Sequence, residues 1–299
     1  MNQRELNELR RRFKPDRTAI SKVYGCYVSS SRQIISYVDA PLGLLSQEEQ
    51  EMYLNLLKKS LSGALGRNLI DIEFSTRQVA DSDEHRLLQT LRQTELQDPN
   101  ALPPALGFLF PAFDDRSANI YNALFYSKDT AQLHQEVIDA VFCIQNAPMS
   151  PQEQQNVFTS ALTETLEKDC SYDVVQAVHE QLRGRIQEHK DSRDPEPLTL
   201  SVREVGDVLT GSGVPEEKAE AFQEACRRQY GQDAALNPRN IIEAGKFQIT
   251  TPEVKITVPP EYSYMVETRI IDGRRFILIP ADDGVEVNGI PVTIPNPQA

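Results

Sequence analysis

The stretch ALGFLFPAFDDRSANIYNALFYSKD, residues 105–129, decides the fold class because it holds two runs of aromatic and aliphatic residues. LGFLFPAF (106–113) and NIYNALFY (119–126) have the composition of strands, and the polar DDRSA between them is typical of a turn. The apolar side chains of the second run fall on both of its faces: Tyr121, Ala123 and Phe125 on one, Ile120, Leu124 and Tyr126 on the other. A strand covered on both faces lies inside a sheet, so the sequence predicts a central strand here.

Helical and strand patterns alternate in the residues that precede these two runs. A capping box at Ser46 and Glu49 predicts the start of a helix. NLIDIEF (68–74) alternates apolar with acidic residues, which predicts a strand with one buried face. A second capping box, Asp81 with Glu84, predicts another helix. The apolar residues of that helix would be Leu87, Leu88 and Leu91.

The first 38 residues predict a helix followed by a hairpin. Leu6, Leu9 and Phe13 recur at spacings of three and four, which indicates an amphipathic helix over residues 3–13. VYGCYV and QIISYV follow it, separated by the turn-forming SSSR, and both are rich in β-branched and aromatic residues. We therefore expect these two segments to pair as antiparallel strands.

Helices dominate the middle of the chain. Ser150, Pro151 and Glu153 combine an N-cap, a proline at the first helical position and a capping-box glutamate. Two helices should follow, ending near residues 168 and 190, and DSRDPEP (191–197) has the composition of a linker. Beyond it, a helical hairpin is predicted, because one helix starts at a further capping box and Pro215 opens the next.

The pattern changes from helical to alternating after residue 240. Asp272-Gly273 and Asn288-Gly289 are favoured two-residue hairpin loops because both dipeptides tolerate the positive φ angles of a type I′ turn. The C-terminal residues therefore predict a small antiparallel β-meander.

These elements together predict an α+β fold in three parts. The length of 299 residues is about twice the commonest domain size of roughly 100–150 residues. We expect a mixed sheet-and-helix domain over residues 1–147, a helical section over 148–235 and the C-terminal meander over 236–299.

The N-terminal helix is basic, whereas the whole chain carries a net charge of −13. Arg10, Arg11, Arg12 and Lys14 could bind a polyanion, but nucleic-acid binders gain affinity by neutralising phosphates, and the acidic remainder would repel them. We therefore expect this helix to dock by its apolar face onto protein, either its own chain or a second copy, with its arginines near carboxylates.

Compartment and redox state follow from what the sequence lacks. No apolar run approaches the roughly 20 residues that span a bilayer, and the N-terminus has no apolar core typical of a secretory signal. The cysteines lie far apart, at 26, 143, 170 and 226, without the paired spacing of a zinc site. We expect a cytoplasmic protein with reduced thiols and with no membrane segment, metal or cofactor.

Two clusters are candidate sites. Asp114, Asp115 and Arg116 could hold a metal or an anionic substrate at the predicted turn, although a solvated hairpin tip is the simpler interpretation. The second cluster is the densest set of possible metal ligands and consists of Asp81, Asp83, Glu84 and His85. A hard cation would accept its carboxylates. Helix capping already explains Asp81 and Glu84 without a metal.

Known catalytic and DNA-binding patterns are incomplete here. HQE (134–136) has the H-x-E spacing of zinc deaminases without their P-C-x-x-C segment. GDVLTGSG (206–213) lacks the lysine of a phosphate-binding loop. The helical hairpin over 201–230 has three glutamates where a helix-turn-helix protein approaches DNA. The sequence therefore predicts no catalytic or cofactor-binding residue.

Several motifs of the chain resemble those of a known family. ELNELRRRFKPD, SLSGALGRNLIDIEFSTRQVADSDEH, FLFPAFDDR, NIYNALFYSKD and IIDGRRFILIPADDGVEVNGI are similar to segments of bacterial proteins grouped as domain-of-unknown-function family 4317. The resemblance extends along most of the chain, and it implies no activity and no functional residue.

The function that the sequence favours is that of a non-enzymatic interaction or regulatory protein, with a protein partner or a second copy as its ligand. One alternative is a nucleic-acid-associated protein that uses the basic N-terminal helix. The other is an enzyme of unfamiliar type that uses the clustered carboxylates.

Overall fold

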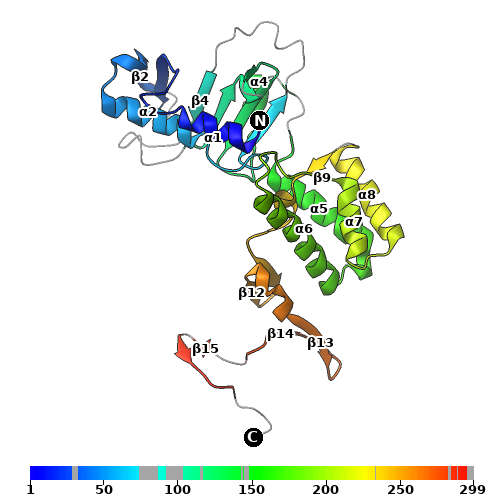
Figure 1. The fold of residues 1–299 in the computed structure, drawn as a ribbon. Helices are drawn as coiled ribbons and strands as arrows, with labels where there is room; N and C mark the ends of the chain where they lie inside the picture. Colours follow the sequence, from blue (N-terminus) through cyan, green and yellow to red (C-terminus); the bar gives the residue numbers. More distant parts are fainter. Residues whose placement is uncertain are drawn as a thin grey trace. The chain divides into compact units, whose positions relative to one another are not determined.

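The computed structural model describes the chain in two compact units, shown in Figure 1. It describes every residue except 29–32, 74–86, 92–103, 115–116, 143, 145–147, 233, 282–283, 288 and 295–299. Unit 1 comprises Met1–Thr159, Glu188–Leu200 and Ala235–Ile241, and unit 2 comprises Ser160–Gln187, Ser201–Ala234 and Ile242–Ala299. Helices and antiparallel strands occur together, so the predicted α+β class is confirmed. The three-part division expected from the sequence stays a prediction.

Unit 1 is built around a four-stranded antiparallel sheet of order β3-β8-β5-β4. Its strands are β3 (Leu69–Glu73), β8 (Asn122–Ser127), β5 (Leu106–Phe110) and β4 (Leu87–Leu91). The two runs of the 105–129 stretch provide β5 and β8, the two inner strands of this sheet. The predicted central strand is therefore confirmed. Asp114, Ser117 and Ala118 of the DDRSA segment belong to the short strands β6 (Ala112–Asp114) and β7 (Ser117–Asn119), which pair with each other.

Each face of this sheet has its own apolar core. On one face, Leu109, Leu124 and Tyr126 pack with α1 (Gln3–Arg11) and with Leu54 of α2 (Gln47–Lys59). On the other, Phe108 and Phe125 pack with α4 (Gln135–Phe142), and Phe142 lies edge-on to both rings at centroid distances of 5.1 and 6.3 Å. Helices therefore cover both faces of the sheet, which explains why β8 is apolar on both sides.

One predicted helix is wrong. Leu87, Leu88 and Leu91 lie in strand β4, which pairs with β5 in the register Leu87↔Phe110 to Leu91↔Leu106. The spacing of these leucines is compatible with a helical stripe, but pairing with a strand about twenty residues later satisfies the same backbone groups and extends the sheet. The capping residues assigned to that helix, Asp81 and Glu84, lie outside the described residues.

The N-terminal hairpin and two predicted helix starts in unit 1 are confirmed. The N-terminal hairpin consists of β1 (Lys22–Val28) and β2 (Ile34–Pro41), paired antiparallel. Ser46 and Glu49 form a complete capping box at α2, and Ser150 and Glu153 cap α5 (Pro151–Leu166) with hydrogen bonds of 2.7 and 3.1 Å. The two capping boxes were predictable because each depends on residues within one helical turn.

Unit 2 is mostly helical up to residue 230 and contains short strands beyond residue 246. It contains the C-terminal part of α5 and most of α6 (Tyr172–Ser192), followed by α7 (Val202–Gly211) and α8 (Glu216–Tyr230), the predicted helical hairpin. Lys218 of α8 donates to the Leu166 carbonyl at 2.8 Å and forms an ion pair with Asp169 at 2.8 Å, which fixes α8 against the end of α5. Among the helices that the structure describes, none combines the length and apolar character needed to cross a bilayer.

The C-terminal strands of unit 2 form three separate antiparallel ladders. They are β11 (Phe247–Thr250) with β12 (Lys255–Val258), β13 (Glu267–Ile271) with β14 (Arg274–Leu278), and β15 (Glu286–Val287) with β16 (Ile290–Pro291). The turn at Asp272-Gly273 is confirmed, with φ angles of 51° and 75°. In the part of the chain that the structure describes, these ladders are separate two-stranded sheets and do not join into one meander.

Candidate functional site

The basic N-terminal helix is docked onto its own unit. Leu6, Leu9 and Phe13 are all buried in the core on the α1 face of the sheet, so the predicted docking by the apolar face is confirmed. A capping box of Asn2 and Glu5 starts the helix.

Arg10 contacts carbonyl groups rather than carboxylates. Its guanidinium donates to the Leu61 carbonyl, at 2.8 Å from Nε, and to the Gly63 carbonyl, at 3.1 Å from Nη2. These carbonyls follow the C-terminal end of α2, where a cation is also favoured by the helix dipole. Partial burial lowers the pKa of Arg10 from its ordinary value. Arg10 therefore holds α1 to the end of α2.

The Arg10→Ala variant is expected to lose about 1 kcal/mol of stability, because two carbonyls lose a charged donor at a partly solvated site. Arg11→Ala is the matched control: Arg11 is exposed on the same helix and should change stability by less than about 0.5 kcal/mol. Urea unfolding of both variants measures the difference. Equal midpoints for the two variants would contradict the role assigned to Arg10.

The other basic residues of this segment divide into engaged and exposed side chains. Arg12 forms an ion pair with Glu8 at 3.0 Å, and its guanidinium carbon lies 5.4 Å from the ring centroid of Phe113. Arg12 is thus near a carboxylate, as predicted, whereas Arg10 is not. Arg11 and Lys14 are exposed. Arg10 and Arg12 therefore make contacts within unit 1, and the exposed Arg11 and Lys14 form a small basic surface.

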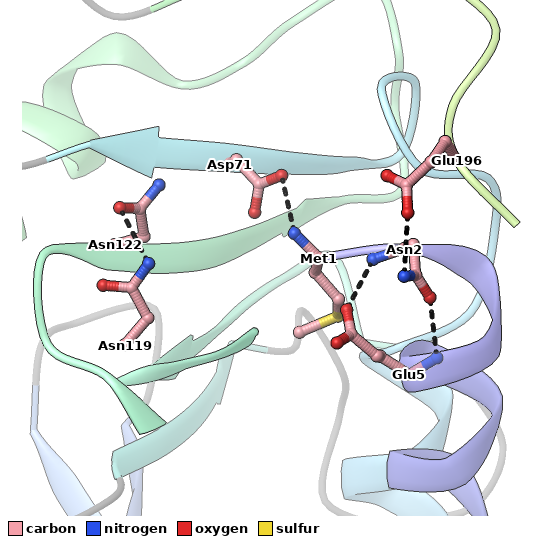
Figure 2. Close-up of polar contacts among 7 residues, drawn as sticks. All are labelled: Met1, Asn2, Glu5, Asp71, Asn119, Asn122 and Glu196. Atoms are coloured by element: carbon pink, nitrogen blue, oxygen red, sulfur yellow. Dashed lines mark hydrogen bonds and ion pairs between the residues drawn. The ribbon is translucent and has the colours of Figure 1, made fainter. Parts of the chain in front are cut away.

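A polar cluster surrounds the first residues of the chain (Figure 2). The amino group of Met1 lies 3.7 Å from Asp71 of β3, and Asn2 donates to Glu196 at 2.9 Å. The backbone N–H of Gln3 also donates to the Pro195 carbonyl at 2.8 Å. The predicted linker, residues 191–197, is therefore attached to the start of α1. In the same view, Asn119 donates to Asn122 at 3.4 Å beside β8. The carboxylates here serve caps and ion pairs, which makes the cluster structural.

Most residues of the two carboxylate clusters predicted from the sequence are not among the described residues. Asp81, Asp83, Glu84 and His85, together with Asp115 and Arg116, lie outside the described residues. Asp114 ends β6, where its backbone is paired with that of Ser117. Within the described residues, no group of three or more His, Cys, Asp or Glu side chains is arranged to hold a metal ion.

A hollow of about 390 Å³ lies between the starts of α4 and α5. Its polar lining includes His134, Glu136 and Glu153. Hydrogen bonds from its own backbone N–H and then from the His134 ring lower the pKa of Glu136, and the His134 Nδ1 to Glu136 Oε1 distance is 3.2 Å. Glu153 accepts from the Ser150 amide at 2.7 Å. Glu153 therefore serves the start of α5, and Glu136 is paired with His134.

The described cysteines differ in exposure. Cys26 is exposed on β1, Cys170 is partly buried and Cys226 is buried in α8. Burial raises the pKa of the Cys226 thiol to about 12 and also raises that of Cys170. Thiols held in this protonated form are poor nucleophiles at neutral pH.

Residues 243–266 of unit 2, here called the α6 strap, run along one face of α6. Tyr172 donates to the Val266 carbonyl at 3.1 Å, and the His179 ring lies 3.0 Å from the Glu243 carbonyl through Nε2. Ser263, which is 1% exposed, donates to Glu180 at 3.1 Å. Polar contacts therefore hold both ends of the strap.

An aromatic contact also anchors the strap. Phe247 of β11 is buried, and its ring meets Tyr172 and His179 edge-on at centroid distances of 6.1 and 5.3 Å. Each contact joins residues far apart in sequence to a single helix face. The C-terminal segment is thus an ordered part of unit 2 as far as Val266.

The β13–β14 hairpin follows the strap and is solvent-exposed. Ile270 is 74% exposed and lies on one face, beside Arg275, while Phe276 and Ile271 lie on the other and are 39% and 44% exposed. All five residues of β13 are exposed. The hairpin thus carries apolar side chains on both faces and buries little of either.

Sequence reasoning located this hairpin but missed its exposure. The Asp-Gly turn and its flanking aliphatic residues predicted a meander, in which the ladders would cover one another. The sequence offers no signal for this exposure, because apolar residues on both faces are equally typical of a strand covered inside a sheet.

Comparison with known proteins identifies a family. A family model described as "Domain of unknown function (DUF4317)" matches residues 1–103 and 99–290. No curated protein and no solved structure matches the chain. The matched ranges cover both units almost to the last residues, and they agree with the resemblance of the sequence motifs. The chain therefore belongs to the family described as domain of unknown function DUF4317.

Proposed function

We propose that this protein is a non-enzymatic, cytoplasmic interaction or regulatory protein that binds a protein partner through its β13–β14 hairpin. The observation that supports this function is the exposure of apolar side chains on both faces of that hairpin, with Ile270 74% exposed. An isolated two-stranded hairpin is marginally stable in water, and exposed apolar clusters mark interaction surfaces. A partner that covers the hairpin would remove this exposure.

The nucleic-acid alternative receives less support. Arg10 and Arg12 are engaged in contacts within unit 1, so the basic segment has only part of its charge available for phosphate. The net charge of −13 also opposes the approach of a polyanion. The enzymatic alternative also receives less support, because Glu153 at the hollow is used by the start of α5.

A photo-crosslinking amino acid tests the proposed function. Benzoylphenylalanine in place of Ile270, in the full chain and in native cells, should give discrete adducts on irradiation. The matched control is the same substitution at Leu44, an 82% exposed apolar residue of unit 1, which should give none. Mass spectrometry identifies the adducts. Absence of adducts at position 270, or equal adducts at both positions, would contradict binding through the hairpin.

A further inference from the structure

The outer edge of β14 has backbone groups available for pairing. In the part of the chain that the structure describes, β14 has one neighbour, β13, in a two-stranded ladder. Bonded pairs alternate with unbonded pairs along an antiparallel hairpin, and the pair that closes a two-residue turn is bonded. Because Ile271↔Arg274 closes the turn, Arg275 and Ile277 direct their peptide groups to the open edge. Neither of them makes a backbone hydrogen bond to a described residue outside the hairpin.

The side chains of β14 divide the strand into a basic half and an apolar half. Arg274 and Arg275 come first and are exposed, and no ion pair joins either of them to another described residue. Phe276 follows and is 39% exposed. Ile277 and Leu278, which are partly buried, complete the strand. A strand that paired with this edge would therefore meet two cations and then three apolar side chains.

The edge of β13 has a different charge. Its cation, Arg269, donates to Glu267 of the same strand at 2.8 and 3.1 Å, so the two charges neutralise each other. The remaining residues of β13 are Thr268, Ile270 and Ile271, which are uncharged. The edge of β13 is thus neutral, whereas the edge of β14 carries two positive charges. A charged partner would distinguish the two edges.

The charge of β14 favours an acidic partner. Opposite charges in facing positions of neighbouring strands are stabilising, and like charges are destabilising. Asp272 in the turn offsets only part of the charge of Arg274 and Arg275. The net charge of −13 belongs to the whole chain, and exposed charges farther away than a Debye length of about 8 Å are largely screened at physiological ionic strength. The two arginines therefore dominate the choice of strand at this edge.

We propose that the partner of the hairpin is an acidic, extended peptide segment that adds a strand to the open edge of β14. This proposal rests on the proposed function, since it names the chemistry of the protein partner. Antiparallel pairing is slightly more stable per residue than parallel pairing. In that direction, the partner residue opposite Leu278 comes first in its chain, and those opposite Arg275 and Arg274 come last. The segment thus has three uncharged residues followed by two carboxylates, and its backbone bonds provide affinity while its carboxylates select the edge.

Two fluorescent peptides that differ only in charge test the proposal with the full-length protein. The first is Ser-Val-Thr-Val-Glu-Glu-Ser, and the second has lysines in place of both glutamates. The first should bind about 10-fold more tightly, because two facing ion pairs replace two like-charged pairs. Fluorescence anisotropy measures both dissociation constants, and the preference should decline between about 0.1 M and about 1 M salt as the Debye length falls. Equal affinities, or no binding of either peptide, would overturn the proposal.

Charge reversal identifies the residues that select the peptide. The double variant Arg274→Glu, Arg275→Glu should prefer the lysine peptide, because the new carboxylates face its ammonium groups. The matched control is Arg203→Glu with Arg228→Glu, which changes the net charge equally at two exposed residues of the helical hairpin. This control should keep the preference for the glutamate peptide. The same preference in both double variants would contradict selection by β14.

Proline substitutions at two matched positions show which edge is used. Ile277→Pro removes an outward N–H of β14 and should weaken binding of the glutamate peptide about 10-fold. Thr268→Pro removes the corresponding N–H of β13, opposite Ile277, and should leave the affinity unchanged. The opposite result would place the added strand on β13 and overturn the proposal.

The crosslinking experiment separates this proposal from the proposed function. Discrete adducts at position 270 in cells, from a protein that binds neither peptide, would overturn the acidic strand and leave the proposed function in place. Selective binding of the glutamate peptide without any adduct at position 270 would contradict the proposed function, while the assignment of the β14 edge would stand.

Discussion

The Phe125→Ala variant is expected to lose about 4 kcal/mol of stability, within the range measured when a buried phenylalanine is truncated. Phe125 is 1% exposed at the centre of the inner strand β8. Its ring packs in the core beneath α4 and meets Phe142 edge-on at 6.3 Å. Neighbours held by a paired sheet cannot collapse into the space, so the transfer cost and the cavity cost add.

Hydrogen exchange of the β8 amides measures this loss of stability directly in the sheet of unit 1. Tyr121→Ala is the matched control, since Tyr121 belongs to the same run of sequence but is 49% exposed. It should change stability by less than about 0.5 kcal/mol. Similar losses in the two variants would contradict the two-sided core.

The Gly63→Ala variant is expected to lose about 3 kcal/mol of stability, because backbone strain and overpacking act together. Gly63 has a φ of +95°, in the region that favours glycine, and an added Cβ would lie 2.5 Å from the Cβ of Asn68. Asn68 cannot easily move, because its side-chain amide donates to the Ser127 carbonyl at 3.1 Å. The variant would therefore displace the junction between α2 and the sheet.

Gly43→Ala is the control for this prediction. No atom lies within 4 Å of a Cβ added at Gly43 and its φ is not positive, so the substitution should have little effect. Thermal unfolding of both variants makes the comparison. A Gly63→Ala protein that unfolds at the same temperature as the wild type would show that Asn68 moves aside without a cost in stability.

The parts of the fold that sequence could predict are those fixed by near neighbours. Ser46 with Glu49, and Ser150 with Glu153, start helices because donor and acceptor lie three residues apart. Phe125 and Tyr126 point to opposite faces of β8 through strand geometry alone, so a central strand followed from the pattern. The helix predicted at Leu87–Leu91 was wrong because the strand that pairs with this segment, β5, is distant in sequence. Five residues also carry too little pattern to distinguish a helix from a strand.

The candidate site was less predictable, for the same physical reason. Arg10 was expected near carboxylates, but its partners are carbonyls at the end of a helix fifty residues away. Ile270 and Phe276 have the composition of a covered hairpin, and whether another element covers them depends on the path of the chain through prolines 259, 260 and 280. Local patterns specify which side chains share a face, and tertiary packing decides whether that face is buried.

The α6 strap has a consequence for the order in which unit 2 can be completed during synthesis. Tyr172 and the Val266 carbonyl that it binds are 94 residues apart, so α6 leaves the ribosome well before the strap exists. At about 5–20 residues per second, the part of α6 that later binds Val266 stays uncovered for on the order of 5–20 s. Throughout that interval the nascent chain displays a helix face that is open to chaperones and to neighbouring nascent chains.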